Sequence, residues 1–149
     1  MSDHPAPNAR FTVMTLGVAD MRRGIAFYGA LGFSRVWPET GEEVAFFDTG
    51  GTMLALYPAD RLAIEAGLDA PPPGAFRGVT LAWNCHGRDE VDAALRFALA
   101  QGARLLKQAE ATHYGGYAGY FADPDGHCWE VVVAPGIAVD TDGRLVLPQ

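Results

Sequence analysis

The spacing of hydrophobic and polar residues along the chain predicts a strand, a helix and three further strands. Residues 11–18 alternate in polarity, which is the period of a strand with one buried face. Residues 21–31 carry apolar side chains at helical spacing, with Asp20 placed to cap the start of the helix and Gly32 to end it. The next patterns predict a strand at 33–37 and a hairpin at 44–57.

The second half of the chain repeats this order. Residues 78–85 predict a strand with one apolar face, and residues 88–101 predict a helix that Gly102 ends. Three more strands are expected, at 103–107, 116–122 and 127–134. An internal repeat of this kind implies two modules related by an approximate twofold axis, with a site shared between them.

The predicted organisation is a single domain, residues 1–149, of the α+β class. Its two βαβββ modules cover residues 10–57 and 77–134. The connecting segment, 58–76, combines a short helix at 58–67 with a Pro-rich linker at 71–74. Residues 135–149 predict a C-terminal arm, in which the Asp142-Gly143 pair favours a hairpin.

The last hairpin of each module follows the same pattern around a turn glycine. Aligning Gly51 with Gly126 places Ala55 on Glu130, so a carboxylate and a methyl group occupy equivalent positions. The acids of Asp123-Pro-Asp-Gly126 are assigned to the turn itself. Proline fixes φ, aspartate accepts hydrogen bonds from nearby amides, and glycine tolerates a positive φ.

The composition argues against several classes of function. The chain has 149 residues, 49% of them hydrophobic, and a net charge of −7 without any Lys or Arg cluster, so nucleic acid is not an expected partner. No apolar run approaches the roughly 20 residues that span a bilayer, and residues 1–8 lack the pattern of a signal peptide. We therefore expect no membrane partner and a cytoplasmic location. Cys85 and Cys128 have no ligand spacing and are expected to be reduced core residues.

Three groups of residues together are typical of one family: Leu16-Gly-Val-Ala-Asp20, then Ala26-Phe-Tyr28 with Leu31-Gly-Phe33, then Asp123-Pro-Asp-Gly126 followed by Glu130. In order and spacing the chain resembles the vicinal oxygen chelate superfamily of glyoxalase I, bleomycin-resistance proteins and extradiol dioxygenases. The resemblance covers residues 10–135 and is closest to uncharacterised glyoxalase-like proteins. It implies that the two βαβββ modules form a curled mixed sheet around a central cup-shaped cavity, and that the protein is a homodimer.

In metal-using members, the resemblance implies one ligand from the first strand and one from the last strand of each module. Carried over to this chain, these positions are Val13, Ala55, Thr80 and Glu130. Only Glu130 is a strong ligand for a divalent ion, whereas catalytic metals commonly take about three protein ligands. We therefore expect no metal and no other cofactor. An unusual metal site that combines His113 with Glu130 stays an alternative to histidines that hydrogen-bond loops.

Glu130 is the candidate catalytic residue, because a lone carboxylate in an apolar cup suits a general acid or base. It could equally orient a cationic or hydrogen-bond-donating ligand. A third reading is structural: Glu130 bonds Thr80, Asn84 or a tyrosine hydroxyl and holds the sheet together. Assigning strand faces, and treating 112–117 as a loop over a cavity, gives the ligand-binding candidates Val13, Met53, Ala55, Tyr57, Thr80, Asn84, His113, Tyr114, Tyr117 and Phe121. Tyr117 and Phe121 are placed with Gly119 on one stripe of the cavity wall.

Three functions compete. The leading hypothesis is a glyoxalase-like protein that binds a small, partly apolar molecule without the usual divalent metal and uses Glu130 as acid or base. The second is a non-catalytic protein that sequesters a drug or metabolite, as the bleomycin-resistance branch does. The third is a metal-dependent lyase or dioxygenase with unusual ligands.

Overall fold

The computed structural model describes residues 5–72 and 74–149. The start of the chain and Pro73 of the expected linker lie outside these residues. The first module contains β1 (Val13–Val18), α1 (Met21–Leu31), β2 (Ser34–Val36), the short 3-10 helix η1 (Pro38–Thr40), β3 (Ala45–Asp48) and β4 (Met53–Pro58). After α2 (Ala59–Glu65), the second module contains β5 (Thr80–Asn84), α3 (Arg88–Ala100), β6 (Arg104–Ala111), β7 (Tyr117–Ala122) and β8 (Cys128–Val133). The chain ends with β9 (Ala138–Val139) and β10 (Leu145–Val146).

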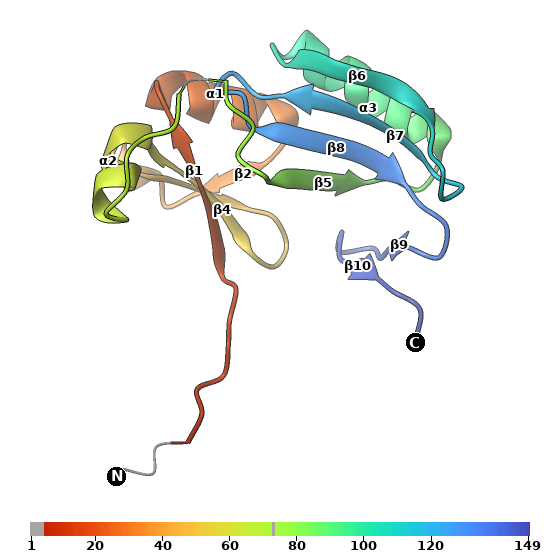
Figure 1. The fold of residues 1–149 in the computed structure, drawn as a ribbon, viewed down its shortest axis with the longest axis horizontal. Helices are drawn as coiled ribbons and strands as arrows, with labels where there is room; N and C mark the ends of the chain where they lie inside the picture. The colour runs from red at the N-terminus through yellow and green to blue at the C-terminus, as the bar shows by residue number, and fades with distance from the viewer. Residues whose placement is uncertain (1–4, 73) are drawn as a thin grey trace.

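The two modules have the same topology, so the predicted α+β fold of paired βαβββ modules is confirmed. Their strands form two four-stranded mixed sheets, ordered β1-β4-β3-β2 and β5-β8-β7-β6. In each sheet the first and last strands of the module run parallel and the other neighbours run antiparallel. Figure 1 shows the two sheets side by side.

The predicted ends of the helices are also confirmed. The side chain of Asp20 accepts a hydrogen bond from the amide of Arg23, and Gly32 ends α1 in the left-handed conformation, with φ 109°. An L residue adopts this conformation at a cost, whereas glycine does not. Helix α3 ends at Ala100, two residues before the predicted stop at Gly102. No helix in the described part of the chain is both long enough and apolar enough to cross a membrane.

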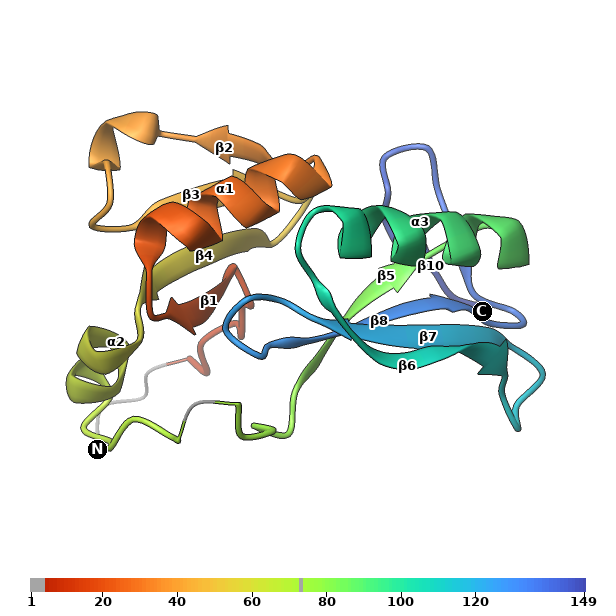
Figure 2. The same cartoon turned by 90° about the horizontal axis from the view of Figure 1, so that it is seen from above.

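Each sheet buries the face that its helix covers. In β1, Leu16 and Val18 are buried while Val13 is 37% exposed, and in β8 Trp129 and Val131 are buried while Glu130 is half-buried. Seen from above, α1 lies along the first sheet and α3 along the second (Figure 2). The buried residues of both modules belong to one continuous hydrophobic cluster. The two modules therefore share one hydrophobic core.

The Asp123–Gly126 turn joins the two modules. The Asp123 carboxylate is 4% exposed and accepts hydrogen bonds from the amides of Asp125 and His127, as the turn assignment predicts. Its other oxygen accepts a 2.5 Å hydrogen bond from the hydroxyl of Tyr28 on α1, and this hydroxyl accepts one from Trp129 Nε1. The turn acid therefore also anchors the second module to the first helix.

Two neighbouring residues strengthen this junction. Asp125 Oδ1 accepts from the amide of Ala19 at 2.8 Å and from Arg23 at 2.9 Å. His127 Nε2 lies 2.7 Å from the carbonyl oxygen of Gly17, and Arg77 lies 2.8 Å from its Nδ1. Because Arg77 can only donate, Nδ1 accepts and Nε2 donates, which assigns the Nε2–H tautomer to His127. This histidine hydrogen-bonds the backbone of β1 and the side chain of Arg77, which lies between α2 and β5.

The cysteines and the C-terminal arm follow the sequence predictions in most respects. Both cysteines are free; Cys85 is buried in the core, and its burial raises the pKa of the thiol to about 11. Cys128 is only half-buried, because it lies on the face of the second sheet opposite α3. In the arm, β9 and β10 form the hairpin expected around Asp142.

Candidate functional site

The four positions at which the family resemblance implies ligands lie on the strands expected for them. Val13 and Ala55 belong to the paired strands β1 and β4, and Thr80 and Glu130 to the paired strands β5 and β8. Ala55 lies opposite Thr15, and Glu130 lies opposite Ala82, so the two modules place their last-strand position in the same register. Ala55 is 1% exposed, whereas Thr80 is exposed.

These residues do not fit a divalent metal. One carboxylate and one neutral hydroxyl fall short of the donor set that such an ion requires. Within residues 5–72 and 74–149, no three His, Cys, Asp or Glu side chains lie close enough together to hold a metal ion. The alternative of His113 with Glu130 therefore lacks a third ligand in this part of the chain.

The carboxylate of Glu130 is held by a tyrosine. Tyr120 lies directly opposite Glu130 in the β7–β8 pairing, and its hydroxyl donates a 2.5 Å hydrogen bond to Glu130 Oε2. This bond, together with partial burial and the carboxylate charge, raises the pKa of Tyr120 to about 12. The phenol therefore stays protonated at neutral pH and keeps donating. One of the three readings of Glu130, a bond to a tyrosine hydroxyl, is present in the structure.

Tyr120 also lines a cavity of about 350 Å³ at the end of the second sheet, which we call the tyrosine cavity. His113 and Tyr114, both predicted as ligand-binding residues, line the same cavity, and their rings meet edge to face at 5.2 Å. Lys107 and Glu110 of β6 form a 2.9 Å ion pair at its border. The structure thus places an aromatic wall with charged groups at its border beside the Tyr120–Glu130 pair.

The placement of Tyr117, Gly119 and Phe121 on the cavity wall is wrong. Phe121 is fully buried in the core and stacks on Trp129, and the Tyr117 hydroxyl bonds Asp92 of α3 at 2.6 Å. A Cβ at Gly119 would lie 2.4 Å from Leu95 of α3. These three residues face the helix, and the alternate residues Ala118 and Tyr120 share the face of Glu130.

Tyr120 is the site residue that sequence reasoning missed. The signal was the turn itself: in a hairpin, residues equally distant from the turn centre lie opposite one another. Ala122 pairs with Cys128 across the Asp123–Gly126 turn. Two residues further from the turn on each strand, Tyr120 pairs with Glu130. This register places Tyr120 on the same face as Glu130. The alternation of side chains along β7 alone does not say whether Tyr120, or Tyr117 and Phe121, share that face.

The remaining candidates lie elsewhere. The Tyr57 hydroxyl donates a 2.6 Å hydrogen bond to Glu65 of α2, which raises the pKa of Tyr57. Met53 and Asn84 line a larger cleft between the modules and the C-terminal arm. Val13, Ala55 and Thr80 line none of the three principal cavities formed by the described residues, and neither does Glu130.

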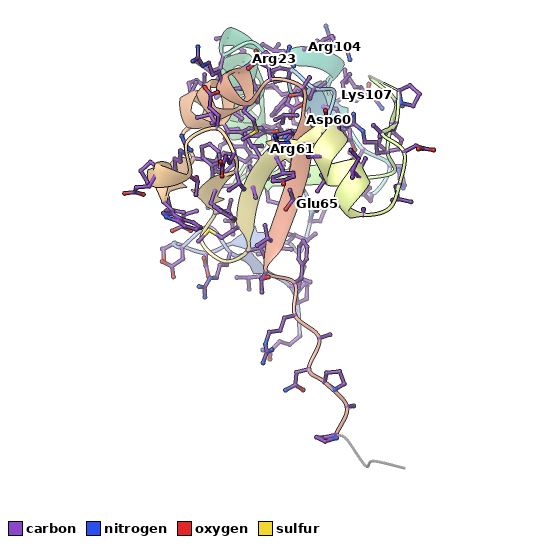
Figure 3. The ribbon with its side chains drawn as sticks, turned by 90° about the vertical axis from the view of Figure 1, so that its left-hand side faces the viewer. Arg23, Asp60, Arg61, Glu65, Arg104 and Lys107 are labelled. Atoms are coloured by element: carbon purple, nitrogen blue, oxygen red, sulfur yellow. The ribbon has the colours of Figure 1, made fainter. Side chains whose placement is uncertain are left out.

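The third cavity, of about 310 Å³, contains none of the predicted site residues. It lies between β1, α2 and the connecting segment, with Leu62 and Phe76 on its wall and Cys128 at one end. Figure 3 shows α2, which carries Asp60, Arg61 and Glu65, standing beside β1. The connecting segment therefore covers part of the first sheet, in addition to linking the modules.

Paired βαβββ modules with this strand order define a class of proteins, and comparison with known proteins identifies the family. The model of the Glyoxalase/Bleomycin resistance protein/Dioxygenase superfamily matches residues 10–131. The chain belongs to this superfamily. A search of curated proteins found no match.

Solved structures show the same relationship. A glyoxalase-related enzyme from Fulvimarina pelagi is 32% identical and superposes with a TM-score of 0.82, over 94% of this chain and 99% of that one. A glyoxalase/bleomycin resistance protein/dioxygenase family enzyme from Burkholderia phytofirmans PsJN is 22% identical, with a TM-score of 0.72 over 85% and 99% of the two chains. A lactoylglutathione lyase from Agrobacterium tumefaciens is 23% identical, with a TM-score of 0.64 over 85% and 95%. The last two show the fold alone.

Proposed function

We propose that this glyoxalase-like protein binds a small, partly apolar molecule against the second sheet, with Glu130 as its polar anchor and without a divalent metal. The observation that carries the proposal is the Tyr120–Glu130 hydrogen bond beside the tyrosine cavity. Glu130 is the one strong ligand group among the four equivalent positions, so the chemistry of this face depends on a carboxylate. The tyrosine cavity, of about 350 Å³, suits a small molecule; Tyr120 lines it and Glu130 does not, so the ligand reaches the carboxylate beyond the phenol.

The hydrogen bond determines what the carboxylate can do. Tyr120 donates to Oε2, so the second oxygen of Glu130 is left to accept a hydrogen bond from an N–H or O–H group of the ligand. The same oxygen can take a proton from a hydroxyl or from a carbon next to a carbonyl group, which is general base catalysis. The neighbouring Tyr114 and Tyr120 rings supply the apolar contact.

The same bond also favours the second candidate, sequestration without catalysis. The phenol occupies one oxygen of the carboxylate with a charge-assisted hydrogen bond and fixes the orientation of the group, which is what a binding anchor requires. Such a group still holds a ligand that carries a donor or a positive charge. The two candidates share one site and differ only in whether the bound molecule is converted.

The test is a ligand found by thermal-shift screening, followed by substitution of the pair. Glu130→Gln and Tyr120→Phe are expected to leave the fold intact and to weaken binding about ten- to a hundredfold, which corresponds to about 1.5–3 kcal/mol for a hydrogen bond to a charged group. Glu39→Gln is the matched control, because Glu39 is exposed on η1, away from the three cavities. Equal affinities for Glu130→Gln and Glu39→Gln would make Glu130 purely structural.

Two further measurements separate the candidates. Recovery of the ligand unchanged after incubation supports sequestration, and a product that Glu130→Gln fails to make supports an enzyme.

Metal analysis of the purified protein tests whether binding is independent of a metal. A stoichiometric divalent ion whose removal abolishes binding would contradict the proposal.

A further inference from the structure

A cleft of about 710 Å³ separates the two modules and is closed on one side by the C-terminal arm. We call it the arm cleft. The first module contributes the end of α1 and the β3–β4 turn, the second module contributes β5 and the start of α3, and the arm contributes the hairpin of β9 and β10. Glu130 and Tyr120 do not line it, so it is separate from the site proposed above.

The floor of the arm cleft is aromatic and aliphatic. Phe33 and Leu54 come from the first module, and Leu81, Trp83 and Trp129 come from the second. Trp129 is 5% exposed and Leu54 is 3% exposed, so both are held firmly by the core beneath them. A rigid apolar floor of this size suits the flat body of an aromatic molecule.

The arm is held in place by specific contacts. Arg144 Nε donates a 3.2 Å hydrogen bond to the carbonyl oxygen of Gly50 in the β3–β4 turn. A Cβ at Gly50 would lie 3.1 Å from the carbonyl oxygen of Asp142, so glycine lets the arm approach this closely. The Asp140 carboxylate accepts from the amides of Asp142 and Arg144 and shapes the hairpin turn. The wall that the arm provides is therefore a built part of the molecule.

The charged residues that line the arm cleft are acidic, and Arg144, which holds the arm, lies outside the lining. Among the described residues that line the cleft, Glu90 and Asp140 are acidic and none is Lys or Arg. His86 donates from its backbone amide and, at 3.0 Å, from Nδ1 to Glu90 Oε2, and these bonds lower the pKa of Glu90. Glu90 is thus ionised at neutral pH. The net charge of −7 adds a long-range attraction for cations.

We propose that the arm cleft is a second binding site, which takes a small aromatic cation. The aromatic group lies on the floor beside Trp83 and Trp129, and the amine faces Glu90 and Asp140. An anion of the same shape meets two carboxylates and no compensating Lys or Arg in the cleft lining.

The test uses 4-phenylbutylammonium as the cation and 4-phenylbutyrate as the anion of matched shape. Neither phenyl group absorbs where tryptophan is excited, so binding is followed by tryptophan fluorescence. A Trp37→Phe background removes the exposed tryptophan outside the cleft and leaves Trp83 and Trp129, which line it. A saturable change with the cation, at about tenfold or greater preference over the anion, is the expected result.

Variants assign the response to the cleft. Glu90→Gln is expected to weaken cation binding about two- to fivefold, the range for a partly exposed ion pair, while Glu39→Gln leaves it unchanged. Removal of residues 135–149 takes away one wall of the arm cleft and is expected to weaken cation binding further. Circular dichroism checks that the shortened protein keeps its fold. No saturable binding, equal binding of cation and anion, or equal effects of Glu90→Gln and Glu39→Gln would overturn the proposal.

The two proposals fail independently. Cation binding in the arm cleft is expected to survive Glu130→Gln and Tyr120→Phe, because neither residue lines the cleft. If Glu130→Gln abolished cation binding, the amine would have to bind at Glu130 on the second sheet. That result would overturn the arm cleft as the cation site. If the ligand proposed for the Glu130 site failed to bind there, the proposal of cation binding in the arm cleft would still stand.

Discussion

At the scale of single residues, the most consequential contacts are those of the buried Tyr28. Its side chain is fully buried, its hydroxyl donates to Asp123, and Trp129 Nε1 donates to it in turn. Burial, and then the Asp123 carboxylate, raise the pKa of Tyr28 well above its usual value. A buried hydrogen-bonded network is stabilising only while each member keeps its partner.

This network predicts a loss of stability in alkali. The folded-state pKa of Tyr28 lies above the value of about 10 in the unfolded chain, so its contribution is fully present below pH 10. It is lost as the pH rises from there through the raised folded-state value. Tyr28→Phe should lower the free energy of unfolding at neutral pH by about 1–3 kcal/mol, because Asp123 loses a buried partner. The same variant should flatten the loss above pH 10.

Urea unfolding at several pH values checks this expectation. Tyr114→Phe is the control, because Tyr114 is 47% exposed and has no part in the network. An unchanged alkaline slope in Tyr28→Phe would show that another group causes the loss.

At the scale of elements, glycines show which contacts a helix or strand needs. Gly29 lies on the exposed side of α1, and a Cβ there would meet nothing within 4 Å. Gly119 of β7 lies under α3, where a Cβ would be 2.4 Å from Leu95 and 3.0 Å from the backbone of Ala109. One glycine is open to replacement, and the other allows the helix to pack closely on the sheet.

The two alanine substitutions should therefore have opposite effects. Gly29→Ala is expected to stabilise the protein by about 0.5–1 kcal/mol, because alanine favours a helix over glycine. Gly119→Ala is expected to destabilise it by about 1–3 kcal/mol through overpacking. Midpoints of chemical unfolding measure both, and a stable Gly119→Ala variant would mean that α3 shifts freely.

At the scale of the whole molecule, the two modules share one hydrophobic core. The cluster includes Tyr28 and Leu56 of the first module and Leu95 and Val131 of the second. The Asp125 and His127 contacts with β1 and α1 bridge the same junction. A module separated from the other would expose this surface, so neither is expected to be stable alone. The homodimer implied by the family resemblance stays a prediction.

A shared core predicts a single cooperative unfolding transition. Far-ultraviolet circular dichroism and tryptophan fluorescence should give coincident curves, with equal calorimetric and van't Hoff enthalpies. Asp125→Ala should lower the midpoint without splitting the transition, since it removes the partner of the Ala19 amide and Arg23. Two separate transitions in the unaltered protein would show that the modules fold independently.

Much of the fold was predictable because its signals are local. The ends of α1 depend on Asp20 and Gly32, and the turn before β8 depends on Asp123 and Gly126, each within a few residues of its effect. The repeat then identified Glu130 as a carboxylate at the position that Ala55 occupies in the first module. Periodicity and turn chemistry act over short stretches of chain, so they are legible in the sequence.

The tertiary structure alone decided the surroundings of these residues. The turn register pairs Tyr120 with Glu130, but which face of β7 the helix covers depends on α3 packing against Gly119. The arm cleft depends on Arg144 reaching Gly50, 94 residues away in the chain. Such contacts join segments whose relative positions follow from packing the whole core, and no local pattern records them.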